Sequence, residues 1–192
     1  KRLEDDGINA VHVSAGVYAS AVWIIQPMAL PRACLADLAQ GIKSAVKIPV
    51  VTVGRINDPD LAETLLAEGK ADLIAFGRQL LADPETPKKI VEGRSEKVHR
   101  LLPGMHDELF LDHPITCTVN PRTGFEREFA FNKAKRSRKV LVIGGGPAGM
   151  EAARVAALRG HNVTLWEKSS NLGGQLPLAS SPPQKGEFAT FT

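Results

Sequence analysis

Three glycines at fixed spacing and a later glutamate form the pattern in this sequence that points most directly to chemistry. Gly144, Gly146 and Gly149 make GxGxxG between an apolar run and a helix-forming segment. The first glycine permits a tight turn, the second lets a pyrophosphate approach the backbone, and the third lets helix and strand pack closely. Glu167 lies where a carboxylate can accept hydrogen bonds from a ribose diol. The pattern predicts a dinucleotide site, with a purely structural glycine-rich turn as the alternative.

Two Gly-Arg pairs are a second set of candidate binding residues. Gly54-Arg55 and Gly77-Arg78 lie twenty-three positions apart, and each follows a short apolar run. In a βα barrel the ends of the last two strands commonly build a phosphate site, where glycine exposes backbone amides and a cation balances the charge. The alternative is that each glycine is a plain turn and each arginine is solvated. The residues alone leave both interpretations open.

The elements around the Gly-Arg pairs alternate between strand and helix. We predict strands at residues 10–14, 50–53 and 73–76, and helices at residues 35–45 and 60–68. The segment from Ala15 to Arg32 is predicted to be a long loop, and loops of that length are usually functional. This alternation indicates parallel βα units.

One further strand-helix-strand unit surrounds the glycine pattern. Residues 140–143 are a continuous apolar run, as expected of a strand covered on both faces. A helix is predicted from Pro147 to about Arg159, because good helix formers fill it and Gly160 ends it. Residues 163–166 then form a second strand, which ends next to Glu167.

The composition is that of an ordinary globular protein. The chain has 192 residues, of which 43% are hydrophobic and 23% charged, enough for one or two domains. With only Cys34 and Cys117, a disulfide framework is not expected. The sequence contains no apolar run of membrane-spanning length and no N-terminal signal pattern, so a reducing cytoplasm is the simplest setting.

The small positive charge does not indicate a nucleic-acid partner. The formal net charge is +3, and much of the excess lies in residues 133–139, just ahead of the glycine pattern. A solvated linker explains this run best. Nucleic-acid binding would need a broader basic face with interleaved aromatic residues, and the chain has only ten Phe, Tyr and Trp residues.

Six segments spread over the whole chain resemble one family of flavin enzymes. They are HVSAG at 12–16, PMALPR at 27–32, VGRINDPDLAE at 53–63, FGRQLLADPE at 76–85, CTVNPRTGFERE at 117–128 and GGQLPLASSPPQKGEF at 173–188. Together they resemble the multidomain NADH:flavin oxidoreductases of the old yellow enzyme class, the family of 2,4-dienoyl-CoA reductase and trimethylamine dehydrogenase. Since the chain does not begin with Met, we expect it to be an internal segment of such a protein.

The resemblance implies an α/β fold in three parts. Residues 1–96 would be the C-terminal part of an FMN-binding (β/α)8 barrel, residues 97–137 a junction segment, and residues 138–192 the start of a Rossmann-like FAD/NAD(P)-binding domain. It implies that Gly54, Arg55, Gly77 and Arg78 contact FMN at its phosphate. It also implies that FAD or ADP is contacted by Gly144, Gly146, Ala148, Gly149, Glu167, Gln175 and Lys185.

The activity that the resemblance implies is a flavin-dependent oxidation or reduction. Electrons from NAD(P)H would reduce an activated C=C bond of a small-molecule substrate, or an amine would be oxidised. Dienoyl-CoA reductases carry a catalytic histidine in the loop after the HVSAG-like strand, where this chain has Tyr18 as the only proton-transfer candidate. The alternative role of Tyr18 is packing at the base of the loop. A homo-oligomer is compatible with this family, and neither a membrane nor a nucleic acid is expected as a partner.

The junction departs from the family in its cysteines. Relatives hold a four-iron four-sulfur cluster with three closely spaced cysteines and a fourth twelve positions later. Counting back from Cys117 without gaps places Met105, Leu101 and Val98 at the other three positions. Three of the four thiolates are therefore missing, and an iron-sulfur cluster is not expected. His99, His106 and His113 do not share a known ligand spacing with Cys117, so no other metal is expected either.

Two other functions remain as alternatives. The loss of cluster ligands is compatible with a nucleotide-binding or electron-transfer scaffold that has no catalysis of its own. An NAD-dependent dehydrogenase with a simple dinucleotide site is less well supported, because GGQ at residues 173–175 resembles the continuation found in flavoproteins.

Overall fold

The chain forms two compact units. The computed structural model describes residues 1–102 and 113–191. The first unit is Lys1–Gly124 and the second is Phe125–Thr192. Residues 97–102 and 113–124, the first part of the predicted junction, belong to the first unit. The three-part functional division stays a prediction.

A parallel three-stranded sheet forms the centre of the first unit. Its strands are β1 (Val11–Val13), β2 (Val50–Thr52) and β3 (Leu73–Ile74), in the order β1-β2-β3. Val11 pairs with Val50, and Val51 pairs with Leu73. Each strand lies inside the range predicted from the sequence. The expectation of parallel βα units is confirmed.

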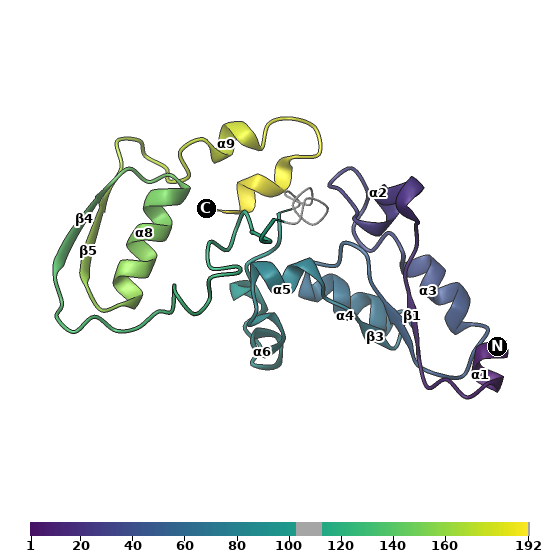
Figure 1. Ribbon diagram of the computed structural model, residues 1–192. Coiled ribbons are helices and arrows are strands. Elements are labelled where there is room, and N and C mark those ends of the chain that lie inside the picture. Colours follow the sequence, from purple (N-terminus) through teal and green to yellow (C-terminus); the bar gives the residue numbers. More distant parts are fainter. Residues whose placement is uncertain (103–112, 192) are drawn as a thin grey trace. The chain divides into compact units, whose positions relative to one another are not determined.

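Helices α3 (Ala36–Lys43) and α4 (Pro59–Ala67) cover this sheet (Figure 1). One core cluster joins Val13, Ala39 and Val50, so α3 packs on β1 and β2. Helix α4 buries Ala62 and Leu65 in a second cluster. It begins where the sequence predicts, because the Asp58 side chain accepts a hydrogen bond from the Asp60 N–H at 3.1 Å.

Several short helices were not predicted. The segment expected to be a long loop contains a 3-10 turn η1 (Tyr18–Ser20) and α2 (Ala21–Ile24). After β3 follow α5 (Arg78–Ala82), α6 (Thr86–Val91) and a 3-10 turn η2 (Ser95–Lys97). These elements are three to six residues long, too short for an apolar periodicity to develop. The N-terminal α1 (Arg2–Asp5) is followed by a turn at Gly7, which has φ 94°.

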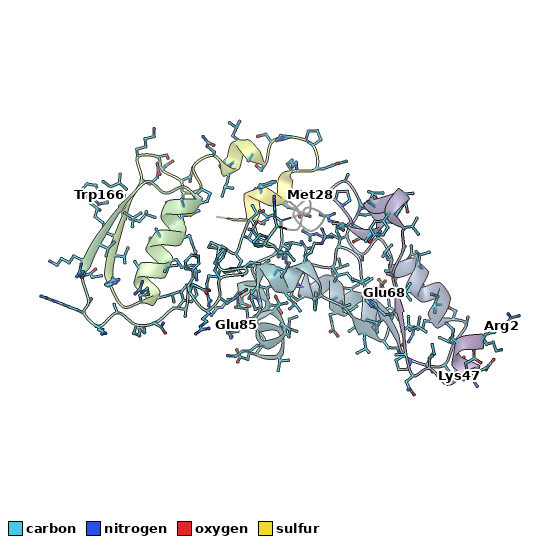
Figure 2. The ribbon with its side chains drawn as sticks, in the orientation of Figure 1. Arg2, Met28, Lys47, Glu68, Glu85 and Trp166 are labelled. Carbon is cyan, nitrogen blue, oxygen red and sulfur yellow. The ribbon has the colours of Figure 1, made fainter. Side chains whose placement is uncertain are left out.

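The second unit is built on one strand-helix-strand unit. β4 (Lys139–Ile143) and β5 (Asn162–Trp166) pair in parallel, with Val140 opposite Val163. Helix α8 (Pro147–Leu158) lies along one face of the two strands (Figure 1). The opposite face is exposed in the described residues, so the expectation that residues 140–143 form a strand covered on both faces is wrong here: every second side chain of β4 points away from α8. Figure 2 shows Trp166 of β5 on that side. Two short helices complete the unit, α9 (Leu176–Ala179) and the 3-10 helix η3 (Gly186–Phe191).

The described residues contain neither a disulfide nor a helix suited to crossing a membrane. Cys34 and Cys117 are both half-buried free thiols. Within residues 1–102 and 113–191, no helix combines the length and the apolar composition that a membrane span requires.

Candidate functional site

The end of β2 turns sharply because two successive residues adopt positive φ. Gly54 has φ 119°, and a Cβ built on it would lie 2.9 Å from the Leu35 Cγ. Arg55 follows at φ 52°, in the left-handed region that non-glycine residues seldom adopt. The turn directs the Arg55 guanidinium to the segment after α2, where Nη1 donates to the Met28 carbonyl at 3.4 Å and to the Leu30 carbonyl. Strain of this kind is concentrated at functional sites.

The end of β3 places a second guanidinium against the same segment. Arg78 is the first residue of α5, directly after Gly77. Its Nη1 and Nη2 each donate to the Gln26 carbonyl at 3.1 Å. Gln26 is 5% exposed, and its own side-chain amide donates to the Trp23 carbonyl. The two strand-end arginines therefore hold the backbone of residues 26–30 between them.

Arg55 lies close enough to Arg78 to influence the pKa of the Arg78 guanidinium. Burial lowers the pKa of Arg78 below its usual range, and the positive charge of Arg55 lowers it further. Cys34 lies in the same electrostatic environment. Burial raises the pKa of its thiol, and Arg55 and Arg78 offset part of that effect. Two neighbouring, partly buried cations fit a bound anion, because a negative group would relieve their repulsion.

The glycine pattern of the second unit forms a tight turn between β4 and α8. Gly144 has φ 104°, and its N–H donates to the Trp166 carbonyl at 2.7 Å. A Cβ on Gly149 would lie 1.9 Å from the Gly144 carbonyl oxygen. The first glycine therefore makes the turn, and the third lets the helix approach it. Both geometric roles agree with the interpretation of the pattern, and the binding role stays a prediction.

Replacing Gly149 with alanine should disrupt this turn. No flexible side chain can yield at 1.9 Å, because the clashing atom is a backbone oxygen. We expect the free energy of unfolding of the second unit to fall by about 1–3 kcal/mol or more, as measured by urea titration. Gly41→Ala in α3 is the matched control, because its Cβ would meet nothing within 4 Å. It should be neutral or stabilise by about 0.5–1 kcal/mol. Equal stabilities for the two variants would contradict the assigned role of Gly149.

The glycine pair Gly173-Gly174 packs against the glycine-rich turn between β4 and α8. The Gly173 N–H donates to the Gly145 carbonyl at 2.8 Å. A Cβ on Gly174 would lie 3.0 Å from the Gly146 Cα, and one on Gly145 would lie 2.5 Å from the Leu172 Cδ2. Gly145 and Gly174 were missed as candidate site residues. The signal was present in the sequence as GGG at 144–146 and GG at 173–174.

Glu167 is held beside this glycine turn by hydrogen bonds to its carboxylate. Oε1 accepts from the Ser169 hydroxyl at 2.6 Å and from the Ser169 N–H at 2.9 Å, and Oε2 accepts from the Gly145 N–H at 2.6 Å. The Ser169 and Gly145 hydrogen bonds lower the pKa of Glu167 to about 2. The side chain is therefore an acceptor at neutral pH, which is the state that a ribose diol requires.

Glu167→Ala should weaken dinucleotide binding by the complete protein. The variant removes the acceptor for the ribose and the Gly145 contact that positions it, so we expect the dissociation constant of FAD or ADP to rise on the order of tenfold. Titration calorimetry with ADP measures it. Glu151→Ala, on the same unit but paired with Arg154 at 2.6 Å, is the control. Unchanged ADP affinity in Glu167→Ala would remove Glu167 from the ribose role.

The remaining predicted site residues lie at the surface. Tyr18 is 85% exposed in η1. In the second unit, Ala148 is in the first turn of α8 and Gln175 directly precedes α9. The Lys185 Nζ lies 5.7 Å from the centroid of the Phe188 ring. No contact in the structure assigns these residues to a ligand, so their roles stay predictions.

The positions that would carry cluster cysteines are partly in the core. Val98 and Leu101 are 8% and 9% exposed, so both side chains pack inside the first unit. Cys117 is half-buried. Met105 and His106 lie outside the described residues. Among the residues that are described, no three His, Cys, Asp or Glu side chains are arranged to hold a metal ion.

Comparison with known proteins agrees with the geometry of both units. Residues 11–97 match the NADH:flavin oxidoreductase / NADH oxidase family, and residues 139–190 match the FAD dependent oxidoreductase family. Residues 11–97 of the chain belong to the NADH:flavin oxidoreductase / NADH oxidase family. Flavin is the cofactor that both families imply, and the relatives of this chain are oxidoreductases of the old yellow enzyme type.

Individual relatives match the chain over nearly its whole length. It is 47% identical over 97% of its residues to a metal reductase of Desulforamulus reducens, and 44% identical over 100% to an NADH oxidase of Thermoanaerobacter brockii. The solved structure of a 2-naphthoyl-CoA reductase matches 96% of the chain with a TM-score of 0.89 at 38% identity. The chain spans 28%, 30% and 29% of these three proteins, respectively.

Proposed function

We propose that the complete protein is a flavin-dependent oxidoreductase that binds FMN in a barrel containing the first unit. The observation that carries this proposal is the pair of neighbouring cations at the ends of β2 and β3. Arg55 and Arg78 come from adjacent parallel strands and direct their side chains to the same segment of backbone. In a βα barrel this edge, at the carboxyl ends of the last strands, is where a phosphate binds.

The residues present fit the phosphate of FMN. A Cβ on Gly77 would meet nothing within 4 Å, so the backbone beside Arg78 is open to a ligand. Arg55 and Arg78 would bind the phosphate and orient the flavin, and their two guanidinium groups suit its charge and geometry. When bound, the isoalloxazine ring supplies the hydride and electron transfer.

For the second unit we propose the start of a Rossmann-like domain that binds FAD or ADP. The turn at Gly144 and the close approach of Gly146 to Gly174 keep side chains away from the N-terminus of α8, a twelve-residue helix. The amides at that N-terminus suit a pyrophosphate. The ionised Glu167 would accept hydrogen bonds from the ribose, which supports a dinucleotide over a single phosphate.

The proposed reaction is NAD(P)H-linked reduction of an activated C=C bond, or the oxidation of an amine. The similarity to a 2-naphthoyl-CoA reductase supports the reductive form, in which a conjugated substrate accepts a hydride and a proton. Tyr18 is the proposed proton-transfer residue, because it is exposed in the segment that follows β1 and precedes the backbone held by Arg55 and Arg78. NAD(P)H would bind in a part of the protein beyond these residues.

A second candidate function is favoured by the junction. Buried Val98 and Leu101 leave no place for two of the cluster thiolates, so a cluster-based relay between two flavin sites has no ligands at these positions. The second candidate is therefore a nucleotide-binding or electron-transfer scaffold without catalysis of its own.

One set of measurements on the complete protein separates these functions. Acid treatment should release FMN together with FAD or ADP, and mixing with NADH in a stopped-flow instrument should bleach the flavin absorbance. Reoxidation by an enone supports the oxidoreductase. Bound nucleotide without NADH-dependent bleaching supports the scaffold, and a protein that releases no flavin rejects the FMN proposal.

A further inference from the structure

Gln79 binds a neighbouring segment of backbone through both ends of its side-chain amide. The residue lies in α5 next to Arg78 and is 2% exposed. Its Nε2 donates to the His99 carbonyl at 2.9 Å and to the Thr86 hydroxyl at 3.1 Å, and its Oε1 accepts from the Leu101 N–H at 2.9 Å. A carbonyl and an N–H two residues apart are the groups that a neighbouring β-strand would pair. Among common side chains an amide supplies both a donor and an acceptor for them.

Other buried side chains hold the same segment. Three contacts reach the backbone of residues 97–101: Asp83 Oδ2 accepts from His99 N at 3.0 Å, Lys89 Nζ donates to Lys97 O at 2.9 Å, and Asn57 Nδ2 donates to Leu101 O at 2.9 Å. Asp83 and Lys89 also form a buried ion pair with 2.6 Å between Oδ2 and Nζ. The first flank of the junction, residues 97–102, is therefore held by buried side chains from the segment before α4, from α5 and the residue after it, and from α6.

The second flank of the junction, residues 117–123, is bound to α5 as well. The Leu81 carbonyl, in the last turn of α5, accepts hydrogen bonds from Asn120 Nδ2 at 2.7 Å and from the Thr123 hydroxyl at 3.0 Å. Asn120 Oδ1 in turn accepts from the Arg122 N–H at 3.1 Å. Because α5 has only five residues, Gln79 and Leu81 cannot move independently of Arg78.

We propose that Gln79 is a positioning residue that couples Arg78, at the proposed flavin phosphate site, to the docking of the junction on α5. This inference rests on the proposed function. A phosphate that fixes Arg78 would fix the short helix α5, which presents Gln79 to the first flank and the Leu81 carbonyl to the second. Coupling of this kind is reciprocal, so a docked junction would strengthen FMN binding by the factor with which FMN strengthens docking. The junction would thereby be linked to the flavin site by hydrogen bonds.

The test compares hydrogen–deuterium exchange of the complete protein with and without FMN. In the wild type, FMN should slow amide exchange in residues 97–102 and 118–123 by about fivefold or more. Gln79→Glu keeps the shape but loses the donor to His99 and places a carboxylate against its carbonyl. It should abolish the FMN-dependent difference and raise the FMN dissociation constant by about the same factor. Gln40→Glu, an exposed glutamine of α3, makes the same chemical change and should alter neither quantity.

A milder variant tests the same coupling if the Gln79→Glu protein does not fold. Asn120→Asp keeps the acceptor for Arg122 and removes only the donor to Leu81, at a half-buried position. It should reduce the FMN-dependent protection of residues 118–123, whereas the exposed control Asn9→Asp should not. FMN binding that leaves the exchange of both flanks unchanged overturns the coupling, as does a Gln79→Glu protein that keeps the FMN-dependent protection. Either result leaves the flavin proposal standing, whereas failure of the wild type to bind FMN rejects both.

Discussion

Replacing Arg78 with alanine is expected to lower the FMN affinity of the complete protein by about a hundredfold or more. Hydrogen bonds to charged groups contribute about 1.5–3 kcal/mol each, and a guanidinium can make two to one phosphate. The loss should therefore reach about 3 kcal/mol, which is a factor of somewhat more than about 100. The affinity is measured by fluorescence titration of the flavin-free protein with FMN. Arg2→Ala, an exposed arginine of the same unit, is the control for loss of charge.

The chemistry of the guanidinium gives a graded series. Arg78→Lys keeps the positive charge but loses the planar fork, so its FMN affinity should fall between those of the wild type and the alanine variant. Arg55→Ala should weaken FMN binding as well. The double variant should lose less than the sum of the two single losses if both side chains bind one phosphate. Strictly additive losses, or an Arg78→Ala protein that retains its FMN, would contradict a shared phosphate site.

Asp83→Asn is expected to have the largest effect on stability. The Asp83 and Lys89 side chains are 5% and 11% exposed, and the variant leaves the Lys89 ammonium buried without a carboxylate. Breaking a buried ion pair by removing one partner costs about 3–5 kcal/mol. We expect the free energy of unfolding at pH 7, from urea titration, to fall by this amount. Asp37 is the control: its side chain is 85% exposed and its Oδ1 lies 3.0 Å from the Lys70 Nζ. Asp37→Asn should lower the free energy of unfolding by about 1 kcal/mol or less.

The effect of Asp83 should also depend on pH. Burial tends to raise the pKa of Asp83, but hydrogen bonds from Lys89 and from the His99 N–H outweigh it and lower the pKa below its ordinary value. The stability from this carboxylate is therefore fully present above the unfolded-state pKa of about 3.9 and is lost as the pH falls through the lower folded-state pKa. The difference in stability between wild type and Asp83→Asn should shrink from pH 5 to pH 2. A difference that stays constant over this range would show that the charge of Asp83 does not contribute.

Local chemistry explains why much of the fold was predictable from sequence. Strands β2 and β4 each contain a short apolar run rich in valine, and the start of α4 is marked by Asp58 and Pro59. The turn at Gly144 needs a positive φ and the contact at Gly149 excludes a Cβ, so glycine at these positions indicates the geometry directly. Such features depend on residues a few positions apart, and their signals can be read along the chain.

The short helices α2, α5 and α6 were missed because they carry no such local signal. Each has four to six residues, which is too few for a helical period to stand out. Arg78 was predicted as a phosphate ligand from its Gly-Arg pair, but its contact with the Gln26 carbonyl, fifty-two positions away, has no local signal. Gln79 was not selected at all, since a single glutamine in a sequence says nothing about the backbone it will pair with.

By itself, the sequence predicted the parallel βα units, the glycine-rich turn at residues 144–149, the candidate cations and the resemblance to one family of flavin enzymes. Only the tertiary structure decided that Arg55 and Arg78 converge on one segment and that α5 carries both flanks of the junction. The physical reason is that strand and turn preferences arise from neighbouring residues, whereas a buried amide such as Gln79 is satisfied by whichever distant backbone the folded chain brings to it.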